Sequence, residues 1–314
     1  MGQTGTAGPA GERVAVIGLG SMGSGMALSL LRAGFAVTGF DVNPAAVARF
    51  VEAGGAGAGT PAAAAEGATV VVSVVLNAAQ TEAVLFGEDG CAAAMAPGSV
   101  FVSSATMAPS AARDLAARLE PRGVHYLDAP ISGGAQRAAD GALTVLVSGS
   151  PVAQAAAEKA LAALAAKVFR LGDAVGTAAG LKIVNQLLAG VHIAAAAEAM
   201  AFAEAHDLDL ATVYEVITAS AGNSWMFENR VPHILAADYT PRSATDIFVK
   251  DLGIVLDIAR ADRIPVPLAS TALQSFLMTS AAGMGRDDDA SVYRLYRSIM
   301  DAAGSKQAKT EGRD

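Results

Sequence analysis

A glycine-rich segment near the start of the chain, with the sequence GLGSMG at residues 18–23, constrains the fold more than any other feature. An apolar run at residues 14–17 predicts a buried strand before it, and an apolar run at residues 26–31 predicts a helix after it. In such a unit Gly18 permits the tight turn, Gly20 lets the backbone approach a pyrophosphate, and Gly23 lets the helix pack close to the strand. Free N–H groups and the dipole at the start of the helix favour an anion there. The segment therefore predicts a dinucleotide-binding site; a glycine-rich turn without a ligand is the alternative.

Asp41 narrows the choice of cofactor. It follows the next predicted strand, residues 36–40, at about 20 residues from the glycines, where dinucleotide-binding folds carry an acid. A carboxylate there accepts hydrogen bonds from the ribose 2′-OH and repels a 2′-phosphate. Residues 42–44 supply no arginine to hold a phosphate. We therefore predict NAD rather than NADP, although an Asp before Asn-Pro could also simply begin a turn.

The composition limits the partners and the chemistry. The chain has 314 residues, 53% of them hydrophobic, and its formal net charge of −8 argues against nucleic acid or an anionic membrane as the main partner. Cys91 is the single cysteine, which excludes an internal disulfide and a Cys-x-x-Cys pair, and the four histidines lack metal-ligand spacing, so we predict no metal. The N-terminus has no signal-peptide pattern, and the apolar stretch at residues 183–205 contains amide and charged side chains. We therefore expect a cytoplasmic protein with a small-molecule substrate.

The first half of the chain alternates short β-branched runs with alanine-rich helical runs. Strands are predicted at residues 14–17, 36–40, 69–76, 100–103, 125–128, 143–147 and 168–171. This alternation predicts a Rossmann-type, doubly wound, mostly parallel sheet with helices on both faces. Ligands in such folds bind beyond the carboxyl ends of the strands.

The β-branched runs stop after residue 172. Residues 177–205 predict one long helix, apolar nearly all round, and the rest predicts helices broken at Gly222, Pro232, Pro241, Pro265 and Gly283. We therefore predict a nucleotide-binding domain at residues 13–174 and an all-helical substrate or dimerisation domain at residues 175–304. The termini, residues 1–12 and 305–314, are expected to be disordered.

Two groups of polar residues follow predicted strands of the sheet. Thr106 comes shortly after the strand at residues 100–103 and could offer a hydroxyl at the carboxyl edge, or could simply begin a helix. The sequence DAPISGG at residues 128–134 follows the next strand. There Gly133 and Gly134 would let backbone N–H groups converge on a carboxylate and Ser132 would add a hydroxyl. A flexible turn without a ligand is the alternative.

Lys182 is the strongest candidate for chemistry. Asn185 and Gln186 follow at i+3 and i+4, so the three side chains share one face of an otherwise apolar helix and need polar partners there. Removal from water lowers the pKa of a lysine, which suits proton exchange with a hydroxyl. A lysine that extends to solvent at a helix end is the alternative. The pair Lys250-Asp251 interrupts another apolar helical run and is explained equally well by a solvated face.

These motifs together resemble the β-hydroxyacid dehydrogenase family over nearly the whole chain, from about Val14 to Tyr296. The resemblance rests on GLGSMG at residues 18–23, DAPISGG at 128–134, the segment 176–185, and Lys250-Asp251-Leu252. It implies a Rossmann-type domain joined by the long helix to a helical domain, with Lys182 as the proton-transfer residue. The resemblance assigns Ser132, Gly133, Gly134, Asn185, Gln186 and Thr106 to the substrate. To the cofactor it assigns Gly18, Leu19, Gly20, Ser21, Met22, Gly23, Asp41, Leu76, Asn77, Thr106 and Lys250.

The residues predicted near the substrate depart from the usual family pattern at two positions. Gln186 stands where a second Asn is common, and Ala105 stands where a Ser often precedes the Thr. The segments at residues 76–82, 185–192 and 223–233 resemble those members that act on a four-carbon polyhydroxy acid, for which Asn223 and Ser224 would add hydrogen-bond partners. We therefore expect NAD-dependent oxidation of the C2 hydroxyl of a short aldonate.

Other readings of the same motifs stay open. Members of the family that oxidise 3-hydroxyisobutyrate or reduce 2-hydroxy-3-oxopropionate are alternatives. A non-catalytic NAD-binding module is an alternative of another class, and imine-reducing relatives generally lack a lysine at the position of Lys182. Because the long helix needs more cover than one small domain gives, we expect a homodimer or homotetramer.

Overall fold

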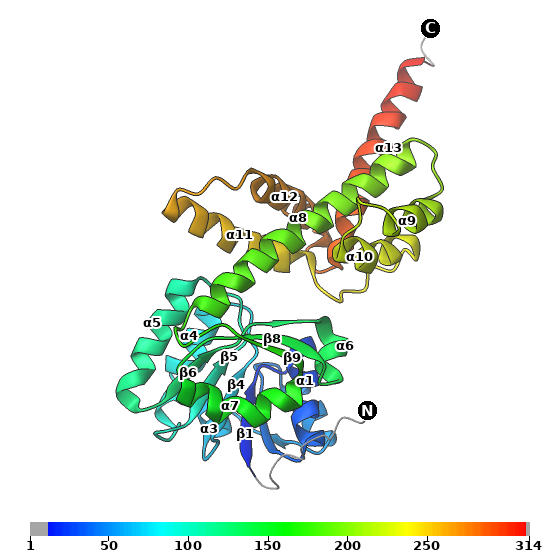
Figure 1. Cartoon of the computed structure of the whole chain (residues 1–314). Coiled ribbons are helices and arrows are strands. Elements are labelled where there is room, and N and C mark those ends of the chain that lie inside the picture. Colours follow the sequence, from blue (N-terminus) through cyan, green and yellow to red (C-terminus); the bar gives the residue numbers. More distant parts are fainter. Residues whose placement is uncertain (1–11, 312–314) are drawn as a thin grey trace. The chain divides into compact units, whose positions relative to one another are not determined.

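The computed structural model describes residues 12–311 and divides into two compact units, residues 1–182 and 183–314 (Figure 1). The predicted disordered N-terminus lies outside the described residues except for Glu12. This division falls inside one helix, eight residues beyond the domain boundary that the sequence predicts at residue 174.

The first unit is built on a parallel sheet of six strands. The order β3-β2-β1-β4-β5-β6 reverses between β1 and β4, which defines a doubly wound Rossmann-type sheet and confirms the predicted fold class. Its strands are β1 (Arg13–Ile17), β2 (Ala36–Phe40), β3 (Ala56–Gly57), β4 (Val70–Ser73), β5 (Val100–Ser103) and β6 (His125–Asp128). The strand predicted at residues 69–76 is shorter in the structure, and the two-residue β3 was not predicted.

Helices cover both faces of this sheet, because its strands are apolar on both sides. Val14 and Val16 point into one core with α1 (Ser21–Arg32), α2 (Pro44–Glu52) and α7 (Pro151–Leu164). Ala15 and Ile17 point into the opposite core with α3 (Pro61–Ala65), α4 (Ala78–Phe86) and α5 (Pro109–Leu119). The successive side chains of one strand therefore supply two hydrophobic cores.

A second, three-stranded sheet lies beside the carboxyl end of β6. It contains β7 (Ile131–Ser132), β8 (Leu143–Val147) and β9 (Ala165–Arg170), with α6 (Gly134–Ala139) between β7 and β8. The strands predicted at residues 143–147 and 168–171 thus form this separate sheet and do not extend the large one. β7 pairs antiparallel with β8, and an isolated bridge joins Asp128 to Ser148.

The long helix α8 (Thr177–Ala205) has 29 residues and matches the predicted range at both ends. By length and composition it could cross a membrane, but half of its most apolar window is buried inside the protein. Core helices of soluble proteins have this property.

The second unit consists of helices, with one isolated bridge between Ala244 and Asp288. Its core includes Ile193, Leu252 and Phe276. Its main helices beyond α8 are α9 (Leu210–Thr218), α10 (Trp225–Leu235), α11 (Thr245–Asp262), α12 (Pro267–Thr279) and α13 (Val292–Glu311).

Two sequence-based expectations for this unit differ from the structure. Pro232 lies inside α10, where the sequence predicts a break. The backbone of α13 is helical to Glu311, which includes most of the segment expected to be a disordered tail, and residues 312–314 lie outside the described residues.

Candidate active site

The glycine-rich loop joins β1 to α1, and its three glycines have different surroundings. Gly18 has φ +96°, and a Cβ there would lie 2.4 Å from the carbonyl oxygen of Val74. A Cβ on Gly23 would lie 1.8 Å from the carbonyl oxygen of Gly18. Beside Gly20, in contrast, a Cβ would meet nothing within 4 Å. Gly18 and Gly23 therefore allow the close packing of the loop, and Gly20 borders open space where a ligand can approach the backbone.

This open space is a cavity of about 400 Å³. It brings together four of the predicted cofactor residues, Leu19, Gly20, Ser21 and Asp41, whereas Gly18, Met22 and Gly23 do not line it. Met22 instead packs, partly buried, against the core of the sheet. The complete lining is Leu19, Gly20, Ser21, Ser24, Leu28, Asp41, Asn43, Ala46, Arg49 and Phe50.

Asp41 is held in place by two backbone groups. Its Oδ2 accepts the N–H of Leu19 at 2.6 Å, and its Oδ1 accepts the N–H of Asn43 at 2.7 Å. A carboxylate held at the end of β2, on the wall of a cavity that begins at the glycine-rich loop, fits the ribose of a dinucleotide. The residues present are therefore compatible with the predicted cofactor.

Arg49 is a cavity residue that the sequence analysis did not find. It is exposed on α2 and lines the same cavity as Asp41. Residues 42–44 contain no arginine, but α2 begins at Pro44 and brings Arg49 back to the cavity. A helix predicted from Pro44 onward would have indicated this position. Arg49 lies about one turn after Ala46, which also lines the cavity, and residues one turn apart lie on the same side of a helix.

Leu76 and Asn77 lie beyond the carboxyl end of β4. The N–H of Leu76 donates to Oε1 of Gln80 at 2.8 Å, and Oδ1 of Asn77 accepts the N–H of Gln80 at 2.9 Å. Asn77 is thus the N-cap of α4. The assignment of both residues to the cofactor, which rests on the resemblance, stays a prediction.

Thr106 and the segment 132–134 lie beyond the carboxyl ends of β5 and β6. Thr106 is half-buried in the loop before α5, and Ser132 is exposed on β7. Gly133 has φ +141° and Gly134 has φ +79°, and a Cβ on Gly134 would meet nothing within 4 Å. Consecutive residues in turn conformations of this kind can direct their N–H groups to one anion. The predicted carboxylate site therefore has a suitable backbone.

The start of α8 is tied to the end of the large sheet by Asp128 and Ser148. Asp128 Oδ2 accepts the N–H groups of Gly176 at 3.2 Å and Ala179 at 2.8 Å, and Ser148 Oγ accepts the N–H of Ala178 at 2.9 Å. These bonds satisfy N–H groups that have no partner within the first turn of a helix. They also set the position of the turn that precedes Lys182. The sequence analysis noted Asp128 only as the first residue of its motif.

Asp128 is almost completely buried, at 1% exposure. Burial raises its pKa to about 6, against the opposite effect of the hydrogen bonds from Ala179, Gly176 and Ser148. The tie between β6 and α8 is therefore a carboxyl group that titrates close to neutral pH.

Lys182 and Gln186 are buried on α8, whereas Asn185 is exposed, so the three do not form one buried stripe as the sequence predicts. Asn185 donates from Nδ2 to Gln186 Oε1 at 2.9 Å, and Gln186 donates from Nε2 to Asp251 Oδ2 at 2.5 Å. Lys250 on α11 donates to Asp251 Oδ1. Asp251 is 1% exposed, so Lys250-Asp251 is not simply a solvated face.

Asn223 and Ser224 make local contacts, but the buried Oδ1 of Asn223 has no hydrogen-bond partner within the described residues. Asn223 donates to the carbonyl of Thr218 and to the carboxylate of Glu228, and Ser224 is the N-cap of α10. The contribution of Asn223 and Ser224 to substrate binding, which rests on the resemblance, stays a prediction.

Other reactive groups have structural surroundings. Cys91 is buried, and burial raises the pKa of its thiol to about 12, which disfavours the thiolate. Within residues 12–311, His, Cys, Asp and Glu side chains form no group of three or more that could hold a metal ion.

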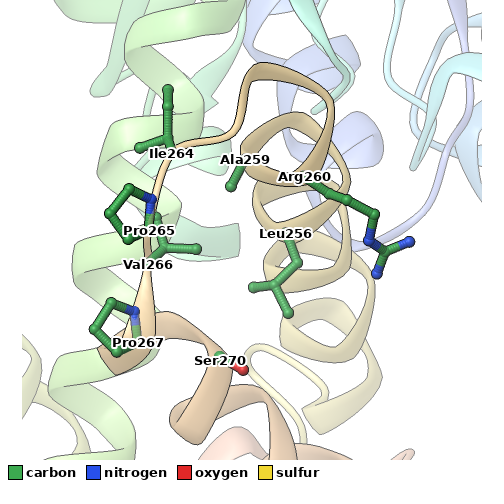
Figure 2. Close-up of a pocket in the computed structure, with 8 residues that line it drawn as sticks. All are labelled: Leu256, Ala259, Arg260, Ile264, Pro265, Val266, Pro267 and Ser270. Atoms are coloured by element: carbon green, nitrogen blue, oxygen red, sulfur yellow. The ribbon is translucent and has the colours of Figure 1, made fainter.

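A second cavity of about 420 Å³ lies in the helical unit, where α11 ends and α12 begins (Figure 2). Its lining is mainly aliphatic, and Figure 2 shows the charged side chain of Arg260 pointing away from the segment of Pro265 and Pro267. The predicted site residues do not line it. Its residues are Leu256, Ala259, Arg260, Ile264, Pro265, Val266, Pro267 and Ser270.

Comparison with known proteins gives family matches over both halves of the chain. A family model described as the NAD binding domain of 6-phosphogluconate dehydrogenase matches residues 13–172. A model described as the NAD-binding of NADP-dependent 3-hydroxyisobutyrate dehydrogenase matches residues 176–296.

Close relatives cover almost the full chain. L-threonate dehydrogenase of Cupriavidus necator is 55% identical over 92% of this chain and 97% of its own length. L-threonate dehydrogenase of Escherichia coli K12 is 49% identical over 91% of this chain and 95% of its own length. A solved structure described as 3-hydroxyisobutyrate dehydrogenase from Salmonella typhimurium has a TM-score of 0.85 and 49% identity, covering 90% of this chain and 99% of that one.

A doubly wound nucleotide-binding sheet, in a chain with such relatives, defines an NAD(P)-dependent oxidoreductase that acts on a CH–OH group. Its substrate is a small molecule. More specifically, the chain belongs to the β-hydroxyacid dehydrogenase family, the 3-hydroxyisobutyrate dehydrogenase-like enzymes.

Proposed function

We propose that this enzyme oxidises the C2 hydroxyl of L-threonate to the 2-keto acid, 2-dehydro-L-erythronate. The observation that carries the proposal is the 55% identity, over 92% of the chain, to an enzyme named L-threonate dehydrogenase. Polar side chains beside Lys182 support it, because a four-carbon polyhydroxy acid needs several hydrogen-bond partners.

In this proposal Lys182 accepts the proton of the C2 hydroxyl. The tie from Asp128 and Ser148 to the first turn of α8 would keep its helix in place during the transfer. Ser132, the N–H groups of Gly133 and Gly134, and Thr106 would bind the substrate carboxylate. Bound NAD supplies the hydride acceptor. The assignment of Lys250 to the cofactor rests on the resemblance.

We propose NAD as the preferred cofactor. Asp41 offers acceptor oxygens to a ribose 2′-OH and would repel a 2′-phosphate. Arg49 on the same cavity would reduce that repulsion, so the preference is expected to be moderate.

The proposal also includes the functional domains, the cellular compartment and the oligomeric state. Functional domains are proposed at residues 13–174 and 175–304, in a cytoplasmic enzyme. A homodimer or homotetramer is supported by exposed apolar side chains at i, i+3 and i+7 on α8, namely Leu181, Val184 and Leu188, and by Phe202 at 66% exposure.

A second candidate is oxidation of 3-hydroxyisobutyrate, the activity in the description of the Salmonella structure at 49% identity. Reduction of 2-hydroxy-3-oxopropionate is a further alternative that shares the same motifs. A substrate panel separates these activities. NADH or NADPH formation is measured with L-threonate, D-threonate, D-erythronate, 3-hydroxyisobutyrate and glycerate, with NAD or NADP respectively, and NADH consumption is measured with 2-hydroxy-3-oxopropionate.

Selective turnover of L-threonate with NAD would support the proposal. Faster turnover of 3-hydroxyisobutyrate would show that this compound, and not L-threonate, is the substrate. NAD binding without turnover of any of these compounds would favour the non-catalytic module.

A further inference from the structure

Side chains of α8 and α11 form a continuous series of hydrogen bonds that ends at Asp251. Asn185 donates to Gln186 at 2.9 Å, Gln186 donates to Asp251 at 2.5 Å, and Lys250 donates to the other oxygen of Asp251. The residues of this series, which we call the Asp251 relay, lie within the helical unit.

The direction of every bond in the relay follows from Asp251. An ionised carboxylate only accepts hydrogen bonds, so the end of Gln186 that faces Asp251 must be its NH₂ group. Gln186 Oε1 is then turned toward Asn185, and only the NH₂ group of Asn185 can donate to it. The oxygen and NH₂ ends of an amide have nearly the same shape. The negative charge of Asp251 therefore decides which way the amides of Gln186 and Asn185 face.

Gln186 and Asp251, which set the orientation, are buried, whereas Asn185, which could bind a substrate, is exposed. Gln186 is 7% exposed and Asp251 is 1% exposed, and both ends of the Gln186 amide bond to protein atoms. Asn185 is exposed, and its Oδ1 points away from the bond that its NH₂ group makes. Asn185 lies at i+3 from Lys182, on the same side of α8.

We infer that Asp251 is a positioning residue that, through Gln186, makes Asn185 present a carbonyl acceptor to a substrate hydroxyl. This inference rests on the proposed function and assigns a different role to Gln186, which transmits orientation and does not contact the substrate. A fixed acceptor beside Lys182 favours an acid with further hydroxyl groups over one that carries a methyl group.

Lys250 pairs with the Asp251 oxygen that Gln186 does not use. Its ammonium group neutralises the buried charge from the partly exposed side, where the Lys250 side chain is 21% exposed. If Asp251 is changed to Asn, Lys250 can only donate and therefore takes the new amide oxygen, which turns the new NH₂ group toward Gln186 and reverses both amides.

The test compares Asp251→Asn with Asp257→Asn. Asp257 lies on the same helix, but its side chain is 76% exposed and forms a loose ion pair of 3.8 Å with Arg260. The first readout is the side-chain NH₂ signals of Asn185 and Gln186 in ¹⁵N NMR spectra, identified by their loss in Asn185→Ala and Gln186→Met. The second is KM and kcat for L-threonate.

We expect Asp251→Asn to shift both NH₂ signals and to raise KM for L-threonate about 10- to 100-fold, with kcat changed only a few-fold, because a hydrogen bond to the substrate is lost. Asp257→Asn should leave both readouts as in the wild type. NH₂ signals and KM that are unchanged in Asp251→Asn would overturn the inference.

If Asp251→Asn does not fold, Gln186→Met decides the matter, because it removes the relay at its centre with a side chain of similar length. A raised KM supports the inference, even if the rise is only about two-fold as for two equally populated orientations of Asn185, and a wild-type KM overturns it. A wild-type enzyme that does not oxidise L-threonate would overturn the proposed function, and the NH₂ signals, which need no substrate, would still decide whether Asp251 orients both amides.

Discussion

Asp128 accepts the backbone N–H of Ala179 at 2.8 Å, so the last residue of β6 holds the first turn of the helix that carries Lys182. Asp128→Ala would leave the N–H groups of Gly176 and Ala179 without their carboxylate acceptor. Because buried donors without partners are costly, we expect the free energy of unfolding to fall by about 1–3 kcal/mol. We also expect kcat to fall. Denaturant unfolding and steady-state kinetics measure both effects, and the exposed Asp114→Ala on α5 is the control. Wild-type values in both measurements would contradict the role given to Asp128.

The pKa of Asp128 predicts a pH dependence of stability. Because burial raises this pKa from 3.8 to about 6, the folded protein keeps a proton that the unfolded chain releases near pH 4. The stabilisation from Asp128 is therefore present at low pH and is lost as pH rises through the folded pKa. The free energy of unfolding should decrease by about 3 kcal/mol between about pH 4 and pH 6 on account of this group. Urea unfolding across this range should show the decrease in the wild type and a flatter profile in Asp128→Asn. Parallel profiles would contradict the prediction.

Local patterns were sufficient for much of the fold. The strands at residues 36–40, 100–103, 125–128 and 143–147 match the structure. Both ends of α8 were also predicted, since its apolar run begins after Gly176 and ends before the polar turn at His206. β7 was not found, because a two-residue strand is defined by its pairing with β8 and not by its own composition.

The contacts of the candidate site could not be predicted from spacing, because they join distant segments. Asp128 and Ala179 are 51 residues apart, and Gln186 and Asp251 are 65 residues apart. The sequence places Gln186 on the right helix face but cannot show that Asp251 fills its hydrogen-bonding capacity. Arg49 could not be predicted from the residues next to Asp41, because it is α2 that brings this side chain back to the cavity.

Lys182 should be essential for the chemical step and dispensable for the cofactor. We expect Lys182→Ala to lower kcat by about 10²- to 10⁴-fold, the usual contribution of a positioned acid–base group. The affinity for NADH, measured by its fluorescence, should stay within a few-fold of the wild type. Lys159→Ala, which removes an exposed ion pair with Glu12, is the control. Primary amines added to Lys182→Ala should restore part of the rate. Near-normal turnover of this variant would show that another group transfers the proton.

Asp41 and Arg49 should act in opposite directions on the 2′ position of the cofactor. Replacing Asp41 by Ser removes the charge that repels a 2′-phosphate and keeps a hydroxyl for the bonds from the N–H groups of Leu19 and Asn43. The ratio of kcat/KM for NADP to that for NAD should therefore rise by about 10-fold or more, in line with the strength of charge-assisted hydrogen bonds to phosphate. If Arg49 supplies that contact, the gain should be lost in Asp41→Ser/Arg49→Ala. It should persist in Asp41→Ser/Arg118→Ala, which removes an arginine paired with Glu82 outside the cavity. Equal ratios in the two double variants would show that Arg49 does not reach the phosphate, and that the change at Asp41 acts only by removing repulsion.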